Sequence, residues 1–300
     1  MASKKLQLLM LGCLVSPAIL QAQSLKKEYI RWQNSEGDKL SATVEAWSRN
    51  GKVTSDDNFF ISRVKPKARF RNQNTQVLKD LNDTNDKRLV AWVPFNNPET
   101  NALPDGIFDS EVFSLWSYVS HWGDWTAPLG RIPAALMDVA HKNGVAVSSA
   151  GTVPFGNLGS EWERELRAIG LLDAQKLANF LYYYGQDGLG YNSEWSEWNR
   201  ITQRLRNKHI EVNKLMESKN PIFENMWYGL TQDRGVNGFS NVLDNNYALT
   251  FGDKDNKAFS LFLNYNWNFR QRLANSVDYA RSLNRDPLYL YAGVNMQGGE

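Results

Sequence analysis

Short runs of apolar residues recur along most of the chain, and polar loops or stretches with helical periodicity separate them. From residue 89 onward this alternation repeats about every 30 residues and predicts seven strands. The predicted strands are residues 89–95, 116–122, 145–153, 187–194, 224–230, 258–265 and 288–294. Helices are predicted between them at residues 133–143, 173–184, 197–218 and 270–283.

Repeated strand–helix units are typical of an α/β fold with parallel strands, and we predict an eightfold (β/α) TIM barrel over residues 89–300. The seventh strand ends six residues before Glu300, so the barrel is expected to be truncated before its eighth strand or closed by an N-terminal piece. Residues 23–88 are polar and irregular, with short β-like pieces at 42–47 and 59–64. They are interpreted as a short N-terminal lead-in segment.

The N-terminus has the pattern of an export signal. Lys4 and Lys5 precede an apolar run at residues 8–15, which is too short to span a bilayer as a helix. A signal peptide of residues 1–22 is expected, cleaved after Ala22, and a lipoprotein form anchored at Cys13 is the alternative. The mature protein is then exported to the periplasm, the cell surface or the medium, and no transmembrane segment is predicted.

Composition narrows the class of function. The chain is 42% hydrophobic and 22% charged, which is typical of a folded protein with a sizeable core. Without the signal peptide 32 basic residues balance 32 acidic ones, which argues against nucleic acid as a partner. The only cysteine, Cys13, lies in the signal peptide, and the three histidines lack ligand spacing. Neither a metal site nor a cofactor is therefore expected.

The fourth predicted strand carries the candidate chemistry. Because strand side chains alternate, Gly188, Gly190, Asn192 and Glu194 share one face, with Asn192 and Glu194 about 6–7 Å apart. The two glycines are expected to leave space inside the barrel below an amide and a carboxyl group. A carboxyl at the C-terminal end of a barrel strand, surrounded by aromatic side chains, can act as a general acid. The alternative is a solvated strand-end carboxylate beside a turn asparagine.

Several short motifs occur in a fixed order over some 210 residues. They are LWSY at 115–118, HWG at 121–123, DVAHKNGV at 138–145, DG at 187–188, NSE at 192–194, WY at 227–228, NYNW at 264–267 and AGV at 292–294. The ordered set resembles glycoside hydrolase family 85, the endo-β-N-acetylglucosaminidases, whose members are built on a (β/α) barrel. The chain also resembles chitinase-like barrels with their D-G-x-D-x-D-x-E pattern, but Gly190 and Asn192 replace the two inner aspartates.

The resemblance to family 85 implies hydrolysis of the β-1,4 bond between the two core N-acetylglucosamines of an N-glycan, free or on a glycoprotein. The implied mechanism is retaining and substrate-assisted: the 2-acetamido group of the sugar attacks and forms an oxazoline. Glu194 matches the general acid/base, Asn192 the residue that holds and polarises the acetamido group, and Tyr228 the tyrosine that hydrogen-bonds the acetamido oxygen.

A separate observation agrees with a nucleophile supplied by the substrate. A retaining glycosidase with its own nucleophile needs a second carboxylate about 5–5.5 Å from the acid. The predicted strands at 89–95, 116–122, 145–153 and 258–265 carry no Asp or Glu at their ends.

Aromatic and amide side chains at the predicted strand ends are candidate sugar contacts, because a ring can stack on the apolar face of a sugar. They are Trp122, Phe155, Asn264, Tyr265, Trp267 and Asn295. Two positions depart from the family pattern, which usually has aspartate where this chain has Gly229 and an acid where it has Asn295. A glycan-binding barrel without turnover and a chitinase-like hydrolase of N-acetylglucosamine polymers are the alternative functions.

Overall fold

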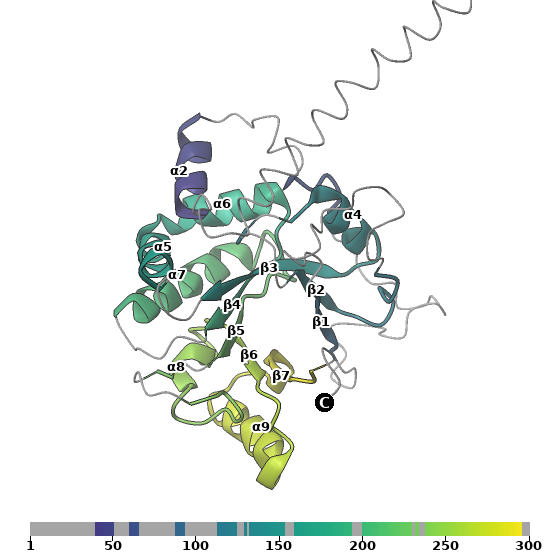
Figure 1. The fold of residues 1–300 in the computed structure, drawn as a ribbon, viewed down its shortest axis with the longest axis vertical. Coiled ribbons are helices and arrows are strands. Elements are labelled where there is room, and N and C mark those ends of the chain that lie inside the picture. The colour runs from purple at the N-terminus through teal and green to yellow at the C-terminus, as the bar shows by residue number, and fades with distance from the viewer. Residues whose placement is uncertain are drawn as a thin grey trace, which may run out of the picture.

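The computed structural model describes residues 40–50, 60–65, 88–93, 113–124, 129–130, 132–153, 159–193, 200–229, 232–233 and 238–295. Within these ranges seven parallel strands form one sheet, and each strand pairs with the next along the chain. They are β1 (Val90–Val93), β2 (His121–Asp124), β3 (Ala146–Val153), β4 (Leu189–Ser193), β5 (Met226–Gly229), β6 (Ser260–Leu263) and β7 (Leu290–Ala292). The sheet curves into a nearly closed barrel (Figure 1), which confirms the predicted (β/α) class.

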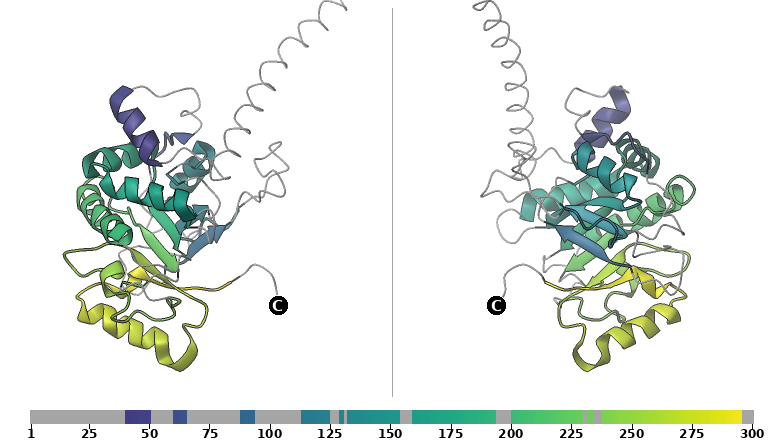
Figure 2. Two further views of the ribbon diagram at one scale, coloured as in Figure 1. Left: turned by 60° about the vertical axis from the view of Figure 1, so that its left-hand side comes forward. Right: turned by 90° about the vertical axis from the view of Figure 1, so that its right-hand side faces the viewer.

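Helices cover the outer face of the sheet (Figure 2). They are α4 (Ala134–Lys142), α5 (Gly159–Leu171), α6 (Ala174–Tyr184), α7 (Arg200–Met216), α8 (Ala248–Phe251) and α9 (Arg272–Ser282), with the 3-10 turns η2 (Phe269–Gln271) and η3 (Pro287–Tyr289). The ends of α6 follow from its sequence: Asp173 accepts a hydrogen bond from the Lys176 N–H at 2.9 Å, and Gly185 ends the helix with φ of 82°. None of the helices in the described ranges is long and apolar enough to cross a membrane.

Side chains along each strand alternate between the helical layer and the barrel interior. In β4, Gly190 and Asn192 face the interior, whereas Tyr191 points toward α7, where its hydroxyl is hydrogen-bonded to Nε2 of His209 at 2.7 Å. Burial lowers the pKa of His209 to about 3, so the imidazole is neutral. The apolar core lies mainly between the sheet and its helices. Polar side chains such as Asn192 face the barrel interior.

A buried charge network lies at the N-terminal end of the barrel. Glu224, just before β5, accepts hydrogen bonds from Arg88, Ser260 and Tyr291. Burial alone would raise the pKa of Glu224, but the neighbouring Arg88 holds it below its ordinary value. Arg88 also donates to the carbonyl of Leu288 at 3.5 Å. Because β1 and β7 share no strand pairing among the described residues, this side chain bridges the seam between them.

The predicted β-like pieces of the lead-in are wrong. Residues 42–47 belong to a helix, α2 (Leu40–Asn50), which packs on α5 and α6. Leu40, Val44 and Trp47 share the buried face of this helix, and the Ser41 hydroxyl donates to Glu165 at 2.6 Å. Residues 60–65, the described part of the other piece, contain no strand.

His141 of α4 connects residues 60–65 to the sheet. Its Nε2 lies 2.8 Å from Oδ2 of Asp187, and its Nδ1 lies 2.5 Å from the carbonyl of Val64. Burial by itself lowers the pKa of His141, but the hydrogen bond and charge of Asp187 outweigh it and raise this pKa. The Ser62 hydroxyl, 3.2 Å from Nδ1, donates to Asp138 at 2.6 Å. Both ring nitrogens of His141 thus face oxygen atoms in structural contacts, and the Ser62 hydroxyl donates to Asp138.

Candidate active site

Three polar side chains meet on the interior face, at the C-terminal ends of β4, β5 and β6. Asn192 of β4 pairs in register with Tyr228 of β5, and Asn264 directly follows β6. The Tyr228 hydroxyl donates to Oδ1 of Asn264 at 3.1 Å. Asn192, Tyr228 and Asn264 are 5%, 7% and 5% exposed. The structure therefore brings together three of the predicted site residues from three neighbouring strands.

The amide of Asn192 has an unused acceptor. Its Oδ1 is buried and receives no hydrogen bond within the described part of the chain. Leaving a buried polar atom unpaired costs about 1–3 kcal/mol, and a ligand N–H would remove that cost. Next to it, the Tyr228 hydroxyl can turn from Asn264 and donate to a ligand oxygen. The pair offers one acceptor and one donor, which is the complement of an amide group.

Trp92 of β1 forms the floor beneath Asn192. A Cβ at Gly190 would lie 2.0 Å from Cη2 of Trp92, and a Cβ at Gly123 would lie 2.9 Å from its Cε3. The indole N–H points at the sulfur of Met226, 3.0 Å away. The empty space predicted at Gly190 is therefore filled by an indole. Sequence reasoning missed Trp92 because the glycines that receive it lie on other strands.

Gly229, one of the two departures from the family pattern, has a backbone explanation. It pairs in register with Ser193, and a Cβ at this position would lie 1.6 Å from the Ser193 carbonyl oxygen. Its φ of +146° is also unfavourable for any residue with a side chain. The close approach of β4 and β5 thus excludes aspartate here, directly beside Tyr228.

A row of aromatic rings runs from Tyr228 to the open surface. The ring centroid of Tyr228 lies 5.1 Å from that of Phe262 and 6.4 Å from that of Tyr265. Tyr265 is 44% exposed. The indole N–H of Trp267 donates to the carbonyl of Gly293 at 2.7 Å and fixes this ring beside the end of β7. Tyr265 therefore lies near the buried polar group, where a sugar ring could stack, whereas Trp267 packs against the apolar core.

Trp122 lies apart from this group. It is fully buried on the outward face of β2, where it contacts Phe113 and Trp116 and packs in a cluster with residues of α4. The interior position beside it belongs to His121, whose Nε2 lies 2.8 Å from the hydroxyl of Ser148. This placement argues against Trp122 as a sugar contact.

The other predicted site residues are at the rim or outside the described residues. Asn295 is exposed and follows β7 by three positions. Glu194 and Phe155 lie outside the described residues, and Glu194 is the next residue in the sequence after Ser193. In the described ranges no three His, Cys, Asp or Glu side chains are placed to hold a metal ion.

The second strand of the barrel differs from its prediction and ends in an acid. The second strand was predicted at residues 116–122, without an acid at its end. Residues 116–118 form a turn, and β2 begins at His121 and ends at Asp124. An aspartate therefore ends this strand, and the lack of strand-end acids no longer supports a nucleophile supplied by the substrate.

A parallel (β/α) barrel with polar groups gathered at the C-terminal ends of its strands has the architecture of a barrel enzyme, and here those groups are amide, hydroxyl and aromatic side chains. A comparison with protein families matches residues 96–300 to glycosyl hydrolase family 85. The chain belongs to this family of glycoside hydrolases.

The solved structures similar to this chain include the glycoside hydrolase domain of Endo-D from Streptococcus pneumoniae R6. The TM-score is 0.61 at 18% sequence identity, over 82% of this chain and 39% of that chain. The present chain thus spans well under half of that structure's length, and at this identity the match shows the fold alone. A search of curated proteins finds no match.

Proposed function

We propose that this protein is an endo-β-N-acetylglucosaminidase that hydrolyses the β-1,4 bond between the two core N-acetylglucosamines of N-glycans. The observation that carries the proposal is the Asn192–Tyr228 pair, which presents an unused acceptor and a hydroxyl donor side by side on the interior face. An acetamido group has one N–H and one carbonyl oxygen, which need one acceptor and one donor. Membership of family 85 supports the same assignment.

In the first step the substrate's own acetamido oxygen is the nucleophile. Oδ1 of Asn192 accepts the acetamido N–H, which increases electron density on the acetamido oxygen. The Tyr228 hydroxyl turns from Asn264 and donates to that oxygen, which holds it against the anomeric carbon. As the oxygen bonds to the anomeric carbon, the glycosidic bond breaks and Glu194, as a carboxylic acid, gives its proton to the leaving sugar oxygen.

The second step opens the protonated oxazoline (oxazolinium) intermediate, whose nitrogen has kept its proton in a hydrogen bond to Oδ1 of Asn192. Glu194, now a carboxylate, takes a proton from a water molecule, and the water oxygen attacks the anomeric carbon as the ring oxygen of the oxazoline leaves. Two displacements at one carbon retain its configuration. Trp92 supports Asn192 from below, because its indole occupies the barrel interior beneath that residue.

The cellular location belongs to the same proposal. The basic start and apolar run of residues 1–22 favour export and cleavage after Ala22, where the enzyme would meet glycoproteins outside the cytoplasm. Mass spectrometry of the exported protein tests this. An N-terminus at Gln23 supports it, and an N-terminus at Met1 or a lipid-modified Cys13 contradicts cleavage after Ala22.

The activity is tested by mass spectrometry of a high-mannose glycoprotein after incubation with the chain lacking residues 1–22. The expected product keeps one N-acetylglucosamine on each glycosylated asparagine. The Glu194→Gln variant is the inactive comparison, and Glu211→Gln, at an exposed position of α7, is the matched control that keeps activity. Unchanged glycoprotein with measurable glycan binding would favour the non-catalytic barrel. Cleavage of soluble chitin oligomers alone would favour the chitinase-like alternative.

A further inference from the structure

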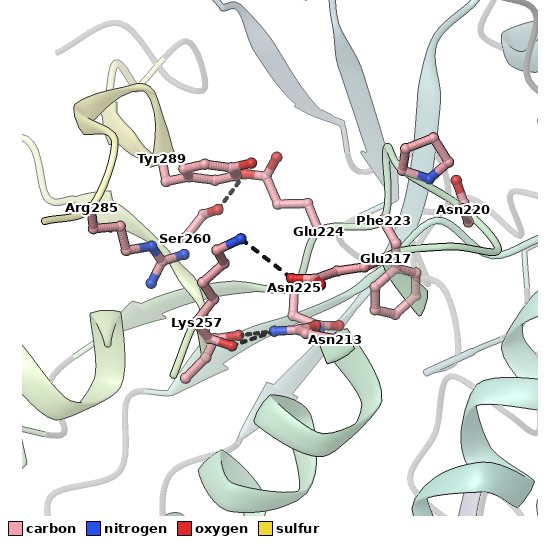
Figure 3. Close-up of a pocket in the computed structure, with 12 residues that line it drawn as sticks. Asn213, Glu217, Asn220, Phe223, Glu224, Asn225, Lys257, Ser260, Arg285 and Tyr289 are labelled. Carbon is pink, nitrogen blue, oxygen red and sulfur yellow. Dashed lines mark hydrogen bonds and ion pairs between the residues drawn. The ribbon is translucent and has the colours of Figure 1, made fainter. Parts of the chain in front are cut away.

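A cavity of about 150 Å³ lies at the opposite end of the barrel from Asn192. Its walls come from the end of α7, the segment before β5, the start of β6 and the turn before β7. Arg285 and Lys257 lie on one side of it, and Asn220 and Phe223 lie on the other (Figure 3). These are the N-terminal ends of the strands, so this cavity is separate from the proposed active site.

Arg285 is buried in the wall of this cavity without a hydrogen-bond acceptor. The residue is 6% exposed, and within the described residues its Nε and Nη1 donate no hydrogen bond. The guanidinium lies over the ring of Phe251, 4.1 Å from the centroid, and 5.1 Å from that of Tyr289. Burial lowers the pKa of Arg285 to about 10, so the group still carries its charge at neutral pH.

The carboxylates around the cavity are already engaged. Glu224 accepts from Arg88 with one oxygen and from two hydroxyl groups with the other. Glu217 pairs with Lys257 at 3.3 Å, near the protein surface. The positive charge of Arg285 therefore has no hydrogen-bonded counter-charge within the described residues. A buried charge of this kind is costly, and a bound counter-ion would lower the cost.

We infer that this cavity binds a small oxyanion, a phosphate, sulfate or carboxylate group, through Arg285, with Lys257 as a second cation at its mouth. The planar fork of a guanidinium matches two oxygens of such a group. Lys257 would exchange part of its contact with Glu217 for the anion. In (β/α) barrels the C-terminal face carries the chemistry and the N-terminal face contributes to stability, so the bound anion stabilises the fold and takes no part in hydrolysis.

Titration calorimetry of phosphate, sulfate and acetate, each at constant ionic strength with sodium chloride and at pH 7.5, tests the inference. We expect saturable binding of at least one anion in the millimolar range. Thermal unfolding should show Tm about 3–6 °C higher at ten times the Kd. Arg285→Met should weaken binding at least about tenfold, because the charge-assisted hydrogen bonds are lost. Arg281→Met is the matched control, since its side chain is 67% exposed on α9, and it should bind as the wild type does.

A second variant keeps the test decisive if Arg285→Met does not fold. The Lys257 side chain is 47% exposed, so Lys257→Met should leave Tm without anion unchanged and weaken binding about threefold to tenfold. Tighter binding of phosphate and sulfate supports a site for a tetrahedral anion. Tighter binding of acetate supports a site for a planar carboxylate. Two results overturn the inference: no saturable binding by the wild type, or a linear rise of Tm with salt that is equal in both variants and the wild type, which is a general salt effect.

Discussion

Replacing Gly229 by alanine should destabilise the barrel at its proposed active site. The new Cβ would lie 1.6 Å from the Ser193 carbonyl oxygen, a backbone atom that cannot rotate away, so β4 and β5 must separate by more than about 1 Å at this point. Lost strand hydrogen bonds cost about 1–3 kcal/mol. A backbone conformation that favours glycine adds about 1–3 kcal/mol. We expect the free energy of unfolding to fall by about 2–6 kcal/mol and Tm by about 4–12 °C.

Urea unfolding followed by tryptophan fluorescence measures this loss. The matched control is Gly238→Ala, whose Cβ would meet only the end of the Gln232 side chain, at 2.3 Å. Because that side chain can move, the control should lose less than about 1 kcal/mol. Aspartate at position 229, the usual family residue, should destabilise at least as much as alanine. Equal stability of Gly229→Ala and Gly238→Ala would show that the close approach of β4 and β5 does not restrict residue 229.

Three further predictions concern single side chains. Glu194→Gln should slow glycan hydrolysis by at least about 10²-fold, because an amide cannot transfer the proton, and near-wild-type turnover would contradict its role. Tyr228→Phe should lower kcat about 10²-fold and Tm by only a few degrees, since it removes one hydroxyl and leaves Oδ1 of Asn264 without that donor. An unchanged kcat would exclude a transition-state contact. The pKa of His141 is raised in the folded state, so the protonated imidazole stabilises that state. This contribution is complete below about pH 6.5, the ordinary histidine value, and is lost as pH rises through the raised pKa. The unfolding free energy of the wild type should therefore fall across that window relative to His141→Gln, and parallel curves for the two proteins would show that the proton at His141 is not linked to folding.

The elements that sequence reasoning found are those whose signals are local. α6 has an aspartate cap and a glycine stop next to its apolar face, and β3 to β7 are short apolar runs between turns. The Asn192–Tyr228–Asn264 group also followed from local motifs, because parallel strands bring equivalent positions to the same end of a barrel.

The elements that it missed depend on contacts between distant segments. Thr43 and Val44 gave residues 42–47 a β-like composition, although Leu40, Val44 and Trp47 have the spacing of a helical face. The apolar pattern predicts a strand at residues 116–122, but the ring of Trp116 packs with Trp122 in the cluster outside the sheet. Trp92 under Gly190 could not be found from either strand alone, because only the closed barrel brings them together.

The contact of Arg88 across the barrel seam has a consequence for the order of folding. It joins the start of β1 to Leu288, 200 positions later in the chain, so it is among the most non-local contacts of the molecule. Closing so long a loop carries a large entropic cost, and such contacts form after the neighbouring strand–helix units have assembled. Interactions made after the transition state affect the rate of unfolding and leave the rate of folding nearly unchanged. We therefore expect Arg88 to affect mainly the rate of unfolding, whereas the successive strand–helix units determine the rate of folding.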